Sequence, residues 1–222
     1  MIDMFLFSKE HLTILLIFLV FLYICPKLTK NLLPYSYLIE KIICLFILLE
    51  IILEQTYILS MGDYNVLTSL PIDMGRFTAY MCIAILFFKN YQLFNVFFSW
   101  SLVSSIGELI FFKDIYYRFP DFTHVLYILS KCLLVYANVY MIEVRKFKIN
   151  RFAIKDNLFM CLIYFSFIYI LNNFTSANYC YSFSNYNISS IFIFAIITTI
   201  IYIPGLISNN DDFRFKIKRR SK

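Results

Sequence analysis

Charged residues are scarce in this sequence, as are glycine and proline. Asp, Glu, Lys and Arg make up 15% of the 222 residues, whereas hydrophobic residues make up 61%. A soluble domain is roughly one quarter charged and one half apolar. The shortage excludes an ordinary soluble domain and predicts an all-α fold, a polytopic membrane helical bundle, because lipid does not tolerate irregular backbone. No polar stretch is long enough to fold separately, so residues 1–222 are expected to form a single integral membrane domain.

Glycine and proline number only 4 and 5. Glycine and proline are the residues that interrupt the broken helices of many transporters, and here they are few. The sequence also shows no internal repeat of the kind those proteins contain. A transporter or substrate-binding membrane subunit is therefore the second interpretation of this sequence rather than the first.

Several chemical motifs are also missing. The six cysteines include no Cys-x-x-Cys pair, so neither a zinc site nor a disulfide framework is predicted. The sequence lacks a phosphate-binding loop and the His-Glu-x-x-His, Gly-x-Ser-x-Gly and calcium-loop patterns. These absences remove support for the common ATPases, zinc peptidases, hydrolases and EF-hand proteins. We expect no cofactor, no metal and no nucleic-acid partner.

Long apolar runs are abundant. A membrane-spanning helix needs about 20 such residues. Seven runs meet this requirement approximately. The first run ends without a signal-peptidase site, so we interpret it as a membrane helix and not as a cleaved signal peptide. The predicted spans are residues 8–25, 37–59, 70–88, 91–112, 122–142, 156–173 and 188–207.

Lys and Arg are distributed unevenly between the two sides of these seven spans. One side carries fourteen, five of them in residues 143–155 and six in a basic tail at residues 208–222, and the other carries three. The positive-inside rule places the rich side in the cytoplasm. This predicts a multi-pass protein of the plasma (cytoplasmic) membrane with its N-terminus outside and its C-terminus in the cytoplasm.

Ionisable residues within the spans gather in the predicted outer half. Asp73 and Arg76 stand three residues apart in the stretch LPIDMGRF, residues 70–77. Such groups usually face a bundle interior or a wet cavity, because lipid does not solvate charge. The same outer half holds Glu50, Glu54, Glu108, His124, Lys131, His11 and Asn178, whereas Glu40 and Lys41 lie at the inner end. We predict an outward-facing polar cavity, although Asp73–Arg76 and Glu108–Lys131 could each be a structural ion pair.

Four short motifs resemble, in order, those of the YwaF-like integral membrane family, whose animal relative is transmembrane protein 164. FSKEHL resembles the family's Phe-Ser-x-x-His-Leu, and LPIDMGRF resembles its Leu-Pro-Leu-His-Leu-Cys. FPDFTHVLYIL resembles its phenylalanine–proline loop with a helix-start histidine, and NNFTSANYCY resembles its Asn…Ala-Asn-Tyr segment. The motifs occupy residues 7–12, 70–77, 119–129 and 172–181.

The resemblance implies an acyltransferase that moves a fatty acyl chain between membrane phospholipids through a cysteine acyl-enzyme and a histidine. His124 matches the helix-start histidine and would be the base, while Arg76 or Asn178 would stabilise an oxyanion or hold a phosphate. The sequence departs from the family where Asp73 replaces a histidine. Ile72 and Gly75 stand where a cysteine is expected, and Cys82 and Cys180 are weak substitutes.

The usual nucleophile is therefore absent, and three alternatives stay open: direct transfer without a covalent intermediate, a degenerate lipid-binding or structural member, and a transporter. The catalytic candidates are His124 and Asp73. The substrate-binding candidates are Arg76, Glu54, Glu108, Asn178 and His11.

Overall fold

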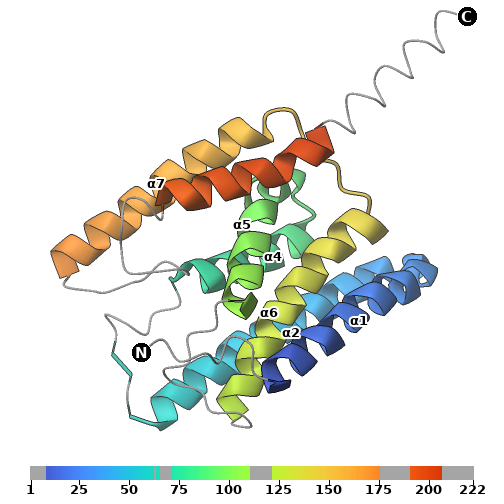
Figure 1. Ribbon diagram of the computed structural model, residues 1–222, viewed down its shortest axis with the longest axis horizontal. Coiled ribbons are helices and arrows are strands. Elements are labelled where there is room, and N and C mark those ends of the chain that lie inside the picture. The colour runs from blue at the N-terminus through green and yellow to red at the C-terminus, as the bar shows by residue number, and fades with distance from the viewer. Residues whose placement is uncertain (1–8, 63, 66–71, 111–121, 176–190, 207–222) are drawn as a thin grey trace, which may run out of the picture.

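The computed structural model describes residues 9–62, 64–65, 72–110, 122–175 and 191–206. These residues form helices and contain no strand, which confirms the all-α helical bundle (Figure 1). The long helices are α1 Lys9–Asn31, α2 Ser36–Ser60, α4 Met74–Phe88, α5 Tyr91–Ile110, α6 Phe122–Val139, α7 Ala153–Thr175 and the helix Ile191–Leu206. The short helical turn η2 Leu33–Tyr35 precedes α2, and the π-helix η3 Tyr140–Val144 follows α6. The basic tail predicted at residues 208–222 lies outside the described residues.

Each of the seven predicted spans overlaps one of these seven helices. Among the described residues, three helical segments are both long and apolar enough to cross a membrane, namely Leu33–Ser60, Val125–Val144 and Ala153–Thr175. Met74–Phe88 and Ile191–Leu206 are apolar but shorter. The number of membrane crossings and the orientation of the chain stay predictions.

Helix α4 begins four residues later than predicted. Asp73 has an extended backbone conformation, and its side chain accepts a long 3.5 Å bond from the Arg76 amide, so it caps the helix instead of extending it. Lys89 ends α4 in the left-handed conformation at φ 55°. The cap fixes where Asp73 and Arg76 lie relative to each other.

Helix α5 lies at the centre of the bundle, in contact with α4, α6 and α7 (Figure 1). Its single tryptophan, Trp100, is fully buried among aromatic rings from α4, α5, α7 and the helix Ile191–Leu206. The Trp100 indole donates a 2.6 Å hydrogen bond to Asn157, whose amide donates to Thr198 at 3.2 Å. These bonds satisfy polar groups that would otherwise be costly in an apolar interior.

The outer surface of the bundle is apolar. Leu16, Leu19, Phe159, Leu162 and Ile196 are each more than half exposed. A water-soluble protein rarely exposes so much contiguous apolar surface, whereas lipid tails solvate it. Several polar side chains are instead buried between the helices, among them Glu50, Lys131 and Asn138.

Candidate functional site

A cavity of about 110 Å³ lies between α2, α4, α5 and α6. Six of its lining residues carry charged side chains: Glu50, Glu54, Asp73, Arg76, Glu108 and Lys131. Its other lining residues are Ile47, Ile51, Gly75, Ala79, Tyr127, Ser130 and Leu134. A space of this size holds several water molecules or a small polar group.

Arg76 connects two helices on one side of this cavity. Its Nε and one terminal nitrogen donate to the two carboxylate oxygens of Glu54, at 2.9 and 2.5 Å. The other terminal nitrogen donates to Asp73 Oδ1 at 3.1 Å. A planar guanidinium suits this paired geometry, and charge-assisted bonds of this kind are the strong ones. The end of α2 is thereby fixed to the start of α4.

Lys131 and Glu108 form a second ion pair, from α6 to α5. Lys131 Nζ lies 2.6 Å from Glu108 Oε2, and the lysine side chain is only 7% exposed. The Tyr127 hydroxyl lies 3.3 Å from the Glu108 carbonyl oxygen and 3.4 Å from Oε2, so it donates toward the same residue. Two buried charges of opposite sign therefore hold α5 and α6 together beside the cavity.

Glu50 is one of four carboxylates in the cavity lining, which together outnumber the cationic side chains there. The lining contains four carboxylates and two cationic side chains. Glu54, Asp73 and Glu108 are all paired, whereas Glu50, which is 7% exposed, forms no ion pair among the described residues. An ionisable group at such a position is a candidate functional residue, because its burial needs a compensating ligand or proton.

The described cysteines do not line this cavity. Cys82 is buried on α4, and Cys44 directs its thiol toward the Ile83 carbonyl at 3.7 Å. Cys180 lies outside the described residues. Gly75, at the position where the family motif has cysteine, provides only backbone to the lining.

The structure brings together four of the predicted site residues, Glu54, Asp73, Arg76 and Glu108. The backbones of His124 and His11 lie in α6 and α1, but their side chains are outside the described part of the chain, as is all of Asn178. The catalytic and binding roles assigned to these seven residues stay predictions.

Four polar lining residues were not among the predicted site residues: Glu50, Tyr127, Ser130 and Lys131. The i,i+4 spacing of Glu50 from Glu54 was a usable signal, because residues four apart share a helix face. The same spacing relates Tyr127 to Lys131. Nothing in the sequence distinguishes Ser130 from the other serines.

The fold and site define a helical membrane protein that encloses a charged cavity between its helices. The sequence model of the TMEM164 family matches residues 6–207, and the chain belongs to this family. This match confirms the resemblance to the YwaF-like relatives of transmembrane protein 164 and, with the apolar exterior, places the chain among membrane proteins. Among curated proteins and among solved structures, none matches the chain.

Proposed function

We propose that this protein binds phospholipids at the charged cavity and transfers an acyl chain directly from one to another. The supporting observation is the cavity itself, which holds the buried carboxylate of Glu50, without an ion pair among the described residues, beside two cationic groups. Acyl transfer needs a base for the attacking group and positive charge near the developing oxyanion. The resemblance to acyltransferases that act on phospholipids supports membrane lipids as the proposed substrates.

The proposed reaction has no covalent enzyme intermediate, because no described cysteine lines the cavity. The hydroxyl oxygen of a lysophospholipid attacks the ester carbonyl carbon of a donor phospholipid, and its proton passes to a base. The bond from the carbonyl carbon to the donor's alkoxy oxygen then breaks, and that oxygen takes up the proton. One ester forms and one is lost, so the exchange is balanced without another reactant.

Two residues are candidates for the base. Glu50 lines the cavity as a carboxylate without an ion pair among the described residues. His124 is the base predicted from the sequence. The cationic groups of Arg76 or Lys131 would stabilise the oxyanion or hold a phosphate, since they are the positive groups in the lining.

The test uses the full chain in lipid discs with an isotopically labelled donor phospholipid and a lysophospholipid acceptor. Mass spectrometry follows movement of the label. We expect Glu50→Gln or His124→Ala to slow transfer by about 10²–10⁴-fold, the usual contribution of a general base. Glu143→Gln is the matched control, because Glu143 is exposed and pairs with Lys146.

Absence of transfer across several donor and acceptor head groups would contradict the enzymatic proposal. Lipid retained without transfer would instead identify a lipid-binding member that catalyses nothing. Transfer that survives both substitutions would reject the two assigned bases.

Transport is the second candidate function, and one observation favours it. Helix α2 carries an ion pair near each end, Glu54 with Arg76 and Glu40 with Arg145. Paired charges at both ends of a helix are suited to closing a pathway alternately from each side. The test measures uptake of solutes into proteoliposomes that contain the protein. Uptake that both Arg76→Gln and Arg145→Gln abolish, in a protein that shows no acyl transfer, would favour this function.

A further inference from the structure

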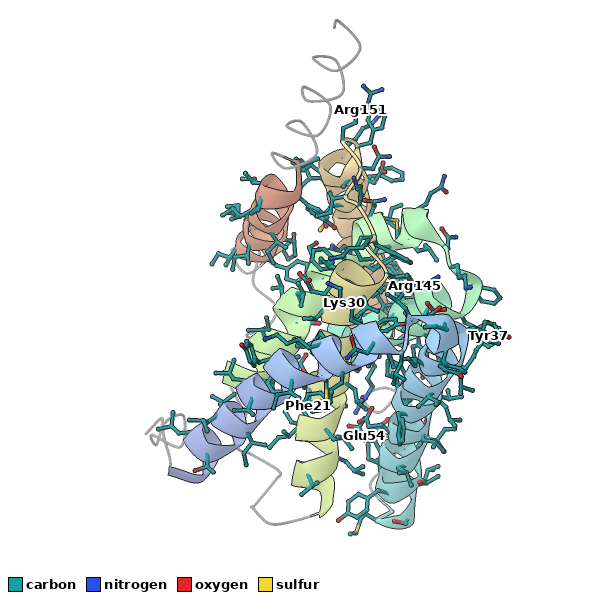
Figure 2. All side chains as sticks on the ribbon, turned by 90° about the vertical axis from the view of Figure 1, so that its right-hand side faces the viewer. Phe21, Lys30, Tyr37, Glu54, Arg145 and Arg151 are labelled. Atoms are coloured by element: carbon teal, nitrogen blue, oxygen red, sulfur yellow. The ribbon has the colours of Figure 1, made fainter. Side chains whose placement is uncertain are left out.

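A second cluster of charge lies at the end of α2 opposite to the cavity. Figure 2 shows Tyr37 and Arg145 near this end, with Glu54 farther along the same helix. Lys41 Nζ lies 3.3 Å from the Phe87 carbonyl oxygen and 3.0 Å from the centre of the Phe87 ring. Lys41 is therefore held at the last turn of α4, where helix carbonyls attract cations.

Lys41 and Lys89 converge on one exposed tyrosine. Their Nζ atoms lie 5.3 and 5.6 Å from the centre of the Tyr37 ring, whose residue is 62% exposed. Lys89 ends α4 and has a left-handed backbone conformation, so the chain turns at this residue. The Lys89 side chain then lies beside α2. Two positive side chains thus lie beside one exposed ring, at distances where a cation is attracted to an aromatic face.

The carboxylate in this cluster does not balance its cations. Glu40 is 2% exposed, and its Oε1 lies 2.7 Å from Arg145 Nε. Its Oε2 is buried without a hydrogen bond in the described structure and lies 4.0 Å from Lys89 Nζ. One carboxylate therefore pairs with two cations, Arg145 and more distantly Lys89. Lys41 adds a third cation beside the same Tyr37 ring.

The surroundings of the two lysines favour a lipid over a free ion. Phe88 is 73% exposed and Phe87 is 49% exposed on the apolar exterior beside them. Aromatic residues and lysines gather where the hydrocarbon meets the head groups. The cluster also lies at the end of the bundle that the Lys and Arg count assigns to the cytoplasm, where the leaflet carries anionic lipid.

We propose that Lys41 and Lys89 bind the phosphate of an anionic phospholipid in the adjacent leaflet, with Tyr37 between them and Phe87 and Phe88 against its acyl chains. The site is separate from the charged cavity and does not depend on acyl transfer. Its ligand class is a phospholipid with net negative charge, and its position predicts the cytoplasmic leaflet.

The test measures lipid retained by the full chain in detergent after incubation with phosphatidylglycerol or phosphatidylcholine, by native mass spectrometry. We expect preferential retention of phosphatidylglycerol, reduced about tenfold or more by Lys41→Gln/Lys89→Gln. The matched control is Lys27→Gln/Lys155→Gln, which removes the same charge from exposed positions on α1 and α7. This control should retain the lipid as the native chain does.

Lys41→Arg/Lys89→Arg keeps both charges and is expected to retain phosphatidylglycerol, which separates loss of charge from loss of folding. Equal retention in the glutamine variant and its matched control would overturn the proposal. Displacement of the lipid by millimolar inorganic phosphate would also overturn it, because the site would then recognise a free anion. Neither result depends on whether the cavity transfers acyl chains.

Discussion

Gly75 lies directly against Glu108. A side-chain carbon built at position 75 would lie 2.8 Å from Glu108 Oε1 and 2.9 Å from Lys131 Nζ. These distances are too short for real contacts, so the ion pair occupies the space that any larger residue at this position would need. The missing side chain at Gly75 therefore makes room for the Glu108–Lys131 ion pair.

Gly75→Ala is expected to destabilise the protein by about 1–3 kcal/mol, the usual cost of overpacking. The added methyl would push Glu108 and Lys131 apart. Thermal unfolding in detergent measures the change. In a Glu108→Ala/Lys131→Ala background the same substitution should cost almost nothing, and an unchanged cost there would show that the clash lies elsewhere.

Arg76→Lys is expected to cost about 1–3 kcal/mol, because lysine cannot reproduce the paired bonds to Glu54 and the bond to Asp73. Chemical denaturation compares the variant with the native chain. Arg151→Lys is the control, since Arg151 is exposed and lies over the Phe152 ring. Equal losses of stability at the two positions would contradict a special role for the Arg76 guanidinium.

Arg145→Met is expected to destabilise the protein by about 3–5 kcal/mol, because Glu40 would be left buried without its closer partner and with only Lys89 at 4.0 Å. Adding Glu40→Met should restore most of the loss. The comparison is Lys146→Met, which breaks an exposed pair with Glu143 and should cost less than about 1 kcal/mol. The unfolding midpoints of these three variants test this, and no recovery in the double variant would argue against the ion pair.

Asn157→Ala is expected to cost about 1–3 kcal/mol, because the Trp100 indole N–H would lose its buried acceptor. Trp100 is the only tryptophan in the sequence, so its fluorescence reports this site alone. The emission wavelength should shift in the variant. An unchanged spectrum and stability would mean that the bond contributes little.

Hydrophobic runs were sufficient to locate the long helices, because each run is mostly apolar and close to membrane length, although α4 has only 15 residues. Helix ends were harder to place. α4 begins after Asp73 because that side chain caps it, and α6 continues as a π-helix through Val144. Both differences depend on local backbone bonds that a hydrophobicity pattern does not record.

The charged site was predictable where residues on one helix share a face or where a charge interrupts a span. Asp73, Arg76, Glu54 and Glu108 were found in this way. The ion pairs Asp73–Arg76 and Glu108–Lys131, both considered from the sequence, are present in the structure. The Arg76–Glu54 pair was not predicted, because Arg76 reaches Glu54 from a different helix. One sequence does not specify which helix faces are adjacent.

The Arg76–Glu54 contact has a consequence for the continuity of the chain. It joins α2 to α4 through side chains, independently of the peptide bonds between residues 62 and 72. A polypeptide cut in that interval would yield two pieces carrying matching opposite charges at the surfaces where they meet. The protein is thereby suited to reassembly from separately made fragments, with Arg76 and Glu54 setting the register of the join.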